Sequence, residues 1–211
     1  MRIAVLAATG ATGRLLVQQA LSRGHTVLAL ARDPAQIDTS ASPHLTAVAA
    51  DVTDRDSVVR ALTDVDVDVV VSGLGVAKGA RPGTLLAGAQ ALTAAQARRP
   101  ALNIVWLGAF GTGQSAGPAG PLVRALLVVA LGAERSDKAN ADAVALAAGA
   151  SVLHPGPLTN KPLSPTRSTV ALADLPRRLF PRTVARATVA AAMLDEAEHP
   201  RQRGHIAVPL T

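Results

Sequence analysis

The chain has 211 residues, 49% of them hydrophobic and only 1% aromatic, so a core of alanine, valine and leucine must fill one large domain or two small ones. The absence of cysteine excludes disulfides, thiol catalysis and cysteine-ligated metal sites, and it fits a reducing cytoplasm. The formal net charge of +6 comes from scattered basic residues without base-stacking aromatic side chains, which argues against nucleic acid and for a small anionic ligand.

The chain opens with a predicted strand, residues 2–6, whose apolar run is typical of a buried parallel strand. It is followed by Ala-Ala-Thr-Gly-Ala-Thr-Gly-Arg at 7–14 and by a helical pattern over about 13–23. Such a strand, turn and helix direct free backbone N–H groups and the positive end of a helix dipole at one point, which suits a pyrophosphate. The segment predicts a dinucleotide-binding turn, with an ordinary turn of small residues as the alternative.

Each residue of this turn has an expected part in cofactor binding. Gly10 and Gly13 leave room where the backbone meets the phosphates and where the helix packs on the strand. Ala7 stands where a glycine is usual, a departure of one methyl group at a position that serves turn geometry. Thr12 either reaches a phosphate oxygen or caps the helix. The candidate cofactor contacts are Ala7, Thr9, Gly10, Ala11, Thr12, Gly13 and Arg14.

Strand and helix signals alternate along the rest of the chain, which predicts a parallel sheet with helices on both faces. The further predicted strands are residues 26–31, 44–50, 67–72, 103–107, 151–154 and 204–208. The further helices are about 54–63, with Asp54 as N-cap, 82–98, 122–131, 135–148 and 181–196, and residues 108–121 form a flexible glycine- and proline-rich loop. We therefore expect an α/β fold with a Rossmann-like doubly wound parallel sheet, a single domain over 1–211 with a small C-terminal substrate region.

Ligands of an open α/β sheet lie beyond the carboxyl ends of its strands, and Arg32 stands at that end of the second predicted strand. About 20 residues after the glycines, an arginine accommodates the 2′-phosphate of NADP, whereas an acidic residue binds the ribose hydroxyl of NAD. Arg32 therefore predicts NADP, against the alternative of a solvated arginine, and the adjacent Asp33 weakens the preference. Arg14 is either a second candidate for the phosphate or a plain surface residue.

The other strand ends supply further cofactor candidates. Asp51 is expected to accept a hydrogen bond from the adenine amine, with Val52 against the ring, unless Asp51 is a cap or turn residue for the helix that follows. The turn Gly73-Leu74-Gly75 lets the backbone pass close to the cofactor sugars, or it is an ordinary turn. The fifth and sixth strands are followed by the remaining cofactor-binding candidates, Gly108, Pro155 and Gly156.

No segment predicts membrane insertion. The chain enters a strand at once, without a signal peptide, and its longest apolar run, residues 122–131, is interrupted by Arg124 and is far shorter than a bilayer span. We expect a cytoplasmic protein, a monomer or homodimer, that acts on a small-molecule substrate and binds neither nucleic acid nor membrane. Neither a cluster of metal ligands nor a serine–histidine–aspartate arrangement is evident in the sequence.

These residues resemble the atypical short-chain dehydrogenase/reductase group, and within it the NAD(P)H-binding family related to NmrA-like proteins and to biliverdin reductase B, a flavin reductase. The likeness spans nearly the whole chain and includes Ala-Thr-Gly-Ala-Thr-Gly at 8–13, Ala-Arg-Asp-Pro at 31–34, Asp-Lys at 137–138 and His-Pro-Gly-Pro-Leu-Thr-Asn at 154–160. It implies a Rossmann fold with NADPH bound across residues 7–14, 32, 51–52 and 73–75.

The chain departs from this resemblance in its catalytic groups. The main short-chain dehydrogenases use a Tyr-x-x-x-Lys pair, and this chain has no tyrosine. Several relatives carry a serine or threonine after the fifth strand, where this sequence has Leu-Gly-Ala-Phe at 107–110. The catalytic candidates that remain are Lys138, which matches a lysine that the relatives place beside the nicotinamide, and His154, which can donate a proton near neutral pH. A solvated lysine and a hydrogen-bonded structural histidine are the alternatives, and weaker candidates are Asp137, Ser115 and Ser136.

The resemblance implies an NADPH-dependent reductase of a flavin, a quinone or a similar flat acceptor, in which hydride geometry suffices and solvent supplies the proton. A non-catalytic NADP-binding regulator of the NmrA-like kind is the alternative, and the missing hydroxyl groups favour it. The loop over 108–121 and the apolar helix over 122–131 favour the enzyme, because together they can form an apolar wall for a hydrophobic acceptor. A dimer interface would explain that helix equally well.

Overall fold

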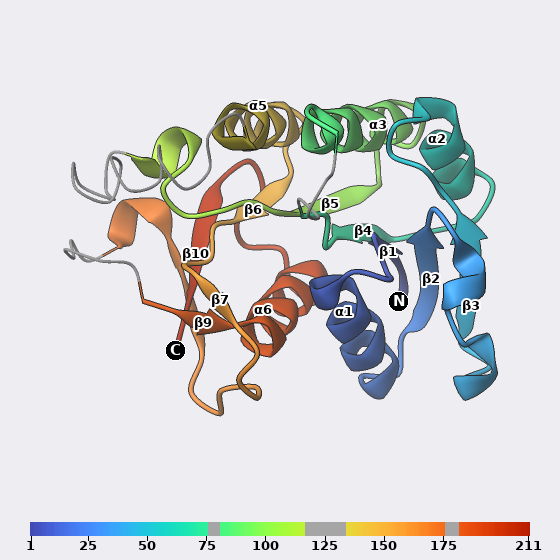
Figure 1. The fold of residues 1–211 in the computed structure, drawn as a ribbon, viewed down its shortest axis with the longest axis horizontal. Helices are drawn as coiled ribbons and strands as arrows, with labels where there is room; N and C mark the ends of the chain where they lie inside the picture. The colour runs from blue at the N-terminus through green and yellow to red at the C-terminus, as the bar shows by residue number, and fades with distance from the viewer. Residues whose placement is uncertain (76–80, 117–133, 176–181) are drawn as a thin grey trace.

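An eight-stranded sheet forms the central layer of the protein, with helices on both sides of it (Figure 1). The structure, a computed structural model, describes residues 1–75, 81–116, 134–175 and 182–211. The strands lie in the order β3-β2-β1-β4-β5-β6-β10-β8, and all neighbours are parallel except β10 and β8. The strands of this sheet are β1 Arg2–Leu6, β2 Thr26–Ala31, β3 Leu45–Ala49, β4 Val69–Ser72, β5 Asn103–Leu107, β6 Ser151–Leu153, β8 Ser168–Ala171 and β10 Ile206–Leu210. A separate parallel pair is formed by β7 Leu158–Thr159 and β9 Val184–Ala185.

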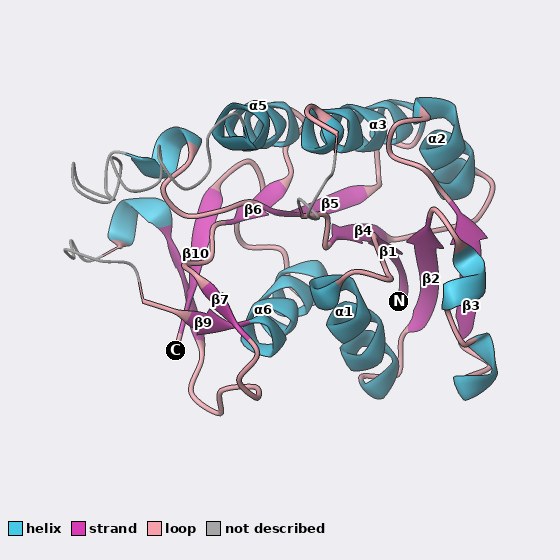
Figure 2. Cartoon of the chain, in the orientation of Figure 1, coloured by secondary structure: helices cyan, strands magenta, loops and turns pink. Residues whose placement is uncertain are grey.

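The helices form two layers, one on each face of the sheet (Figure 2). One layer contains α2 (Arg55–Thr63), α3 (Thr84–Arg98) and α5 (Glu134–Ala147), and the other contains α1 (Ala11–Ser22) and α6 (Arg186–Glu198). Successive strand residues pack into different cores: Ala4 and Leu6 of β1 lie with the first layer, whereas Ile3 and Val5 lie with the second. Because both faces are buried, the strands read as continuous apolar runs, which is why the sequence reveals them.

The observed order confirms the Rossmann-like doubly wound fold predicted from the alternating signals. The predicted bounds of β1, β2 and β5 are also the observed ones, and Asp54 caps α2 by accepting hydrogen bonds from the N–H groups of Asp56 and Ser57. The predicted helix over 122–131 lies outside the described residues. Among the helices that the structure describes, none is long and apolar enough to cross a membrane.

Several short elements differ from the prediction. Helix α6 begins at Arg186 rather than at 181, because Val184 and Ala185 pair with β7 before the helix starts. Strands β7, β8 and β9 were not predicted, since two to four residues are too few to establish an alternating pattern. The segment after β5, which was expected to be irregular, contains a short 3₁₀ helix over Gly113–Ala116. Further 3₁₀ turns that were not predicted are Pro34–Gln36, Thr39–Ala41 and Leu172–Asp174.

An ion-pair cluster joins the end of α1 to α6. Arg23 Nη1 lies 3.0 Å from Asp195 Oδ1 and 3.0 Å from Glu198 Oε1, and His25 Nε2 lies 2.8 Å from the same Glu198 oxygen. Burial raises the pKa of Glu198, but hydrogen bonds from His25 and Arg23, with the charges of both, outweigh it and hold the pKa below its ordinary value. The carboxylate therefore stays charged and stabilises the contact between the two helices of this layer.

Replacement of Glu198 by glutamine is expected to reduce stability only where the carboxylate is ionised. Because the folded-state pKa is lowered, the ion pair stabilises the fold above the unfolded value of 4.5, and this contribution is lost as the pH falls through the folded value. Urea unfolding at neutral pH should show a loss on the order of 1 kcal/mol, as for a partly exposed pair. An Asp64→Asn variant at the exposed end of α2 serves as control. A Glu198→Gln deficit that persists unchanged in acid would contradict this assignment.

Candidate functional site

The chain between β1 and α1 forms a tight turn at the carboxyl edge of the sheet, where the strand order reverses between β1 and β4. Ala7 has a φ of +60°, and no other non-glycine residue of the described ranges has a positive φ. The Gly10 N–H donates to the Ala7 carbonyl at 2.9 Å, and Gly10 is the N-cap of α1. No described side chain caps this helix, and its first turn has no acidic residue. The first N–H groups of α1 are therefore available to an anion.

Gly13 and Gly73 allow three stretches of backbone to cross at this turn. A Cβ on Gly13 would lie 2.0 Å from the carbonyl oxygen of Ala7, and a Cβ on Gly73 would lie 3.1 Å from the nitrogen of Gly13. Gly13 is thus the glycine that lets α1 pack on the turn after β1, as the sequence predicted. Gly73 is needed for this same packing, whereas the space around Gly75 is open. The expected approach of the Gly73 backbone to cofactor sugars stays a prediction.

The polar side chains of this turn, Thr12 and Arg14, do not cap helix α1. Thr12 does not cap α1, because Gly10 holds the N-cap position, and its side chain is largely buried with 6% exposed. Arg14 is exposed and turns back, so that its Nε donates to the carbonyl oxygen of Thr9 at 2.9 Å. This contact holds the Arg14 guanidinium beside the turn after β1, and its part in binding a phosphate stays a prediction.

Arg32 follows the carboxyl end of β2, and Asp51 follows that of β3. Arg32 and Arg81, which comes shortly before α3, both lie near Asp51. The pKa of Asp51 is lowered first by a hydrogen bond from the Thr53 N–H at 2.9 Å; burial opposes this, and the Thr53 hydroxyl and the charges of Arg32 and Arg81 lower it further. Asp33 accepts hydrogen bonds from Ala35 and Gln36, which engages its carboxylate locally. The result is an edge with two exposed guanidinium groups.

Asp51 stabilises the turn after β3 and is also a candidate to bind the cofactor. Both Thr53 hydrogen bonds end on Oδ1, so Oδ2 is not used by that turn, and the cap of α2 is Asp54 rather than Asp51. Val52 and Leu74 are 7% and 8% exposed and pack in the core beneath α3, where Gly88 makes room for Leu74. Val52 has little surface left for an adenine ring and the Leu74 side chain little for the cofactor sugars, so Asp51 is the better candidate of this group.

Gly108, Pro155 and Gly156 meet at the carboxyl ends of β5 and β6. The Gly108 N–H donates to the Leu153 carbonyl at 2.9 Å, and the Phe110 N–H donates to the Pro155 carbonyl at 3.0 Å. The two chain segments that follow these strands are therefore held together by backbone hydrogen bonds, and their part in cofactor binding stays a prediction.

Helix α5 approaches this edge with Asp137 and Lys138. The Asp137 carboxylate accepts hydrogen bonds from the N–H groups of Leu85 and Leu86 at 3.1 and 3.0 Å. It thereby caps α3, whose own N-cap is Gly83. Asp137 is a structural residue in this arrangement. Lys138, the next residue, is partly buried on α5.

His154 follows β6 and is fully buried. Its Nδ1 lies 2.8 Å from Ser115 Oγ, and its Nε2 lies 3.0 Å from Asp142 Oδ2, although this second contact is not aligned as a hydrogen bond. The fold thus brings together a serine, a histidine and an aspartate. The sequence did not reveal these three residues as a group. In a hydrolytic triad the serine binds Nε2 and the carboxylate binds Nδ1, which is the reverse of the arrangement here, and the serine is accessible. Here Ser115 is completely buried, so it is not a nucleophile.

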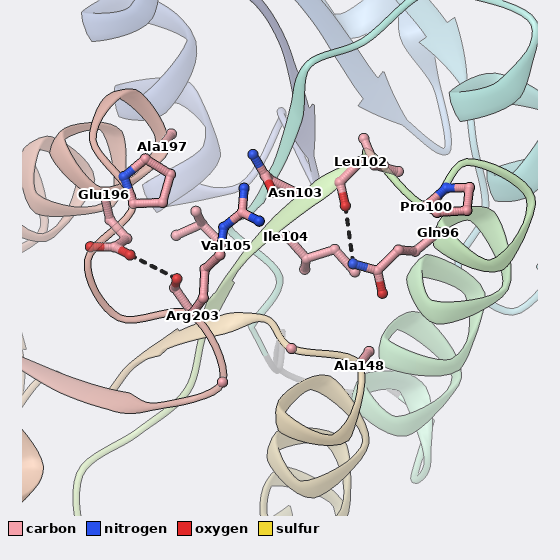
Figure 3. A pocket seen from close by; sticks show the side chains of 14 residues that line it. Gln96, Pro100, Leu102, Asn103, Ile104, Val105, Ala148, Glu196, Ala197 and Arg203 are labelled. Atoms are coloured by element: carbon pink, nitrogen blue, oxygen red, sulfur yellow. Dashed lines mark hydrogen bonds between the residues drawn. The ribbon is translucent and has the colours of Figure 1, made fainter.

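A cavity of about 330 Å³ lies at the opposite edge of the sheet, between the amino ends of β5 and β6 (Figure 3). Its lining includes Asn103, Arg203 and the buried Glu196, whose Oε1 accepts hydrogen bonds from the Ser151 hydroxyl and from two backbone N–H groups. Those bonds tie α6 to the turn before β10. The cavity is therefore separate from the glycine turn, which lies at the carboxyl edge where ligands of such sheets bind.

Sequence reasoning missed Arg81 and Asp142. Arg81 carries a weak signal, a basic residue shortly before the predicted helix over 82–98. Asp142 stands four residues after Lys138 and thus on the same helix face, but the spacing alone does not indicate a partner. Among the described residues, no group of three or more histidine, cysteine, aspartate or glutamate side chains is placed to hold a metal ion.

Comparison with known proteins gives a family and a fold. The profile of a family described as NAD(P)H-binding matches residues 7–200. No curated protein matches the sequence. The oxidoreductase ylbE from Lactococcus lactis is 18% identical with a TM-score of 0.78, and the match covers 99% of this chain and 90% of that one.

Two further solved structures have the same TM-score of 0.78 and cover 100% of this chain. The anaerobilin reductase ChuY from Escherichia coli is 17% identical and is covered over 97% of its length. A wide-type short-chain dehydrogenase/reductase from Veillonella parvula, in complex with NADP, is 13% identical and is covered over 94%. At these identities the likeness shows the fold.

The left-handed conformation of Ala7 makes Ala7→Gly a stabilising substitution. An L-residue with a side chain in this region costs roughly 1–2 kcal/mol, of which the greater flexibility of unfolded glycine offsets a part, so a net gain of about 0.5–1 kcal/mol is expected. Urea or thermal unfolding without cofactor measures it. The neighbouring Ala8→Gly variant, at a buried position without a positive φ, should instead lose stability. A lower melting temperature for Ala7→Gly would overturn the strain argument.

Proposed function

Because the chain belongs to the family of NAD(P)H-binding domains, we propose that it is an NADPH-dependent oxidoreductase that reduces a flavin, a quinone or a similar flat acceptor by direct hydride transfer. We take residues 1–211 as one nucleotide-binding domain. The observation that carries the proposal is the uncapped N-terminus of α1, held against a turn whose glycines keep Cβ atoms away. A dinucleotide whose pyrophosphate is bound there would supply a hydride from its dihydronicotinamide, that is, two electrons and one proton.

The residues present fit such a dinucleotide from one end to the other. The N–H groups at the start of α1 would hold the pyrophosphate, with Thr9, Ala11 and the Arg14 guanidinium beside them. Arg32 and Arg81 would bind the 2′-phosphate, because guanidinium groups form forked hydrogen bonds with phosphate oxygens. The free Oδ2 of Asp51 would accept a hydrogen bond from the adenine amine. Gly108, Pro155 and Gly156 would border the nicotinamide.

The chain's own part in the reaction is mainly to orient the reactants. The chain has no tyrosine, so no tyrosine hydroxyl can transfer a proton to the acceptor. Hydride transfer to a flavin or quinone needs close and oriented reactants more than it needs an acid from the protein, and water can supply the second proton. Lys138 at the head of α5 is the residue we assign to the acceptor or to the nicotinamide ribose, where an ammonium group would stabilise developing negative charge.

A regulatory protein that binds NADP without turnover is the second candidate. The observation in its favour is Gly108, which offers no hydroxyl group after β5, together with the complete burial of His154 and Ser115. In such a protein the same cofactor contacts would report the state of the NADP pool rather than position a hydride. The two functions therefore share the cofactor site and differ in turnover.

Arg32→Glu is expected to abolish the preference for NADPH over NADH. Loss of hydrogen bonds to a charged phosphate costs about 1.5–3 kcal/mol, which is a roughly ten- to hundredfold loss of NADPH affinity, with NADH affinity little changed. Isothermal titration calorimetry with both cofactors measures this, and Arg81→Ala should weaken NADPH in the same direction. Arg98→Glu, an exposed arginine at the far end of α3, is the matched control. Equal affinities of the unsubstituted protein for NADPH and NADH would sink the role given to Arg32.

The reaction itself is tested by following NADPH oxidation with FMN, riboflavin, quinones and small carbonyl compounds as acceptors. We expect turnover with a flat acceptor and a lower kcat for Lys138→Ala. An unchanged NADPH dissociation constant then assigns the lysine to the acceptor, and a raised one assigns it to the nicotinamide ribose. Lys161→Ala, an exposed lysine after β7, should behave like the unsubstituted protein. Tight NADPH binding without turnover of any acceptor would favour the regulatory protein instead.

A further inference from the structure

His154 lies at the centre of a buried network that joins four separate parts of the fold. Besides its contacts with Ser115 and Asp142, the network includes Trp106 of β5, whose Nε1 donates to Asp142 Oδ1 at 3.0 Å. Thr112, from the segment after β5, places its hydroxyl 3.3 Å from Asp142 Oδ2. All of these side chains are at most 3% exposed. Buried polar groups persist in a fold only when their partners are in place, so the network specifies one arrangement of its four parts.

The segment after β5 depends on Ser115 for its shape. Ser115 Oγ accepts a hydrogen bond from the Gly111 N–H at 2.8 Å, and it lies 2.9 Å from the Thr112 carbonyl and 2.8 Å from His154 Nδ1. A single hydroxyl thereby closes the turn on itself and attaches it to the imidazole. The 3₁₀ helix over Gly113–Ala116 is the part of the segment that this attachment holds.

Gly108 is the residue that gives the imidazole its space. A Cβ at Gly108 would lie 2.4 Å from His154 Cδ2, 2.5 Å from Nε2 and 2.9 Å from Asp142 Oδ1. Any side chain at 108 would therefore displace the His154–Asp142 contact. The buried position of His154 therefore depends on a glycine at position 108.

Asp142 connects the network to Lys138. The two residues are four apart on α5, so they lie on the same helix face, one turn from each other. A contact that fixes Asp142 against His154 and Trp106 therefore fixes the rotation of α5 at the turn that carries Lys138. Asp137 anchors the same turn to α3 from its other side.

We propose that His154 is a positioning residue, which through Ser115 and Asp142 holds the segment over 108–116 and the Lys138 turn of α5 in place as the acceptor-side wall of the site. Because His154 is fully buried, it acts through its partners and does not touch the substrate. The part of this proposal that concerns the acceptor rests on the proposed function; the structural part does not.

The network is tested first without cofactor or acceptor. Trp106 is the only tryptophan of the chain, so its fluorescence reports the Asp142 contact directly. His154→Ala and the milder Ser115→Ala should change the emission and speed hydrogen exchange of the Gly111 amide about tenfold or more. His44→Ala, an exposed histidine before β3, should change neither. If both network variants fold with unchanged emission and exchange, the positioning role is wrong.

The coupling of positions 108 and 154 gives a second, independent measurement. Gly108→Ser should strongly lower the melting temperature of the unsubstituted protein, because the new Cβ meets the imidazole. It should lower it much less in a His154→Ala background, where the two shortest contacts are gone and only the approach to Asp142 Oδ1 at 2.9 Å remains. Equal effects in the two backgrounds would overturn the packing argument. Because the comparison uses the change in melting temperature within each background, it still holds when His154→Ala lowers the stability of the folded protein without unfolding it.

The functional part is read from the kinetics of the same variants. Ser115→Ala should keep the NADPH dissociation constant and lower kcat/KM for the acceptor on the order of tenfold, since small displacements of positioning groups are costly. His154→Ala should show at least the same loss, and His154→Asn, whose amide can reach Ser115 from near the Nδ1 position, should recover part of it. Unchanged kinetics with altered Trp106 emission would refute the acceptor-side role. Absence of turnover in the unsubstituted protein would refute the proposed function while leaving the fluorescence and exchange results decisive for the network.

Discussion

The close crossing of α1 over the turn after β1 is the constraint on which the rest of this edge depends. No side-chain atom fits between Gly13 and the Ala7 carbonyl, since even a Cβ would lie 2.0 Å from that oxygen. The helix therefore lies close enough for Gly73 of the neighbouring strand end to pack on Gly13 in turn. This arrangement directs the free N–H groups of α1 to the point where the strand order reverses. The strain at Ala7 is a cost of this geometry, which the surrounding buried strands maintain.

Much of the fold was predictable because its physical causes are local. A strand buried on both faces must be apolar throughout, so β1, β2 and β5 are visible as runs of residues. The glycine turn is equally visible, since Gly10 and Gly13 are required by contacts within a few residues of themselves. The short strands β7 and β9 depend instead on pairing with each other across the chain, and such pairing leaves no periodic pattern.

The site was predictable only where it depends on the ends of strands. Arg32 and Asp51 could be named as candidates because each follows a recognisable strand. Arg81 and the surroundings of His154 could not, because their significance arises from contacts over long separations in the chain, such as Ser115 with His154. The role of Asp137 likewise depends on contacts with a distant part of the chain. The resemblance drew attention to it as part of a motif, whereas in the fold it caps a helix that begins more than 50 residues earlier in the chain.

Strand β10 follows β8 in the chain but lies between β6 and β8 in the sheet. During folding, β8 cannot join the sheet before β10 is present, because β10 is its sheet partner. The two strands beyond β6 must therefore join the sheet late, with unpaired N–H and C=O groups exposed at β6 until β10 is inserted. On a ribosome, strands β1 to β5 can acquire their sheet contacts while this edge is still open. The order of insertion thus makes β10 the strand whose loss would both leave β8 without a sheet partner and turn β6, still paired with β5, into an exposed edge.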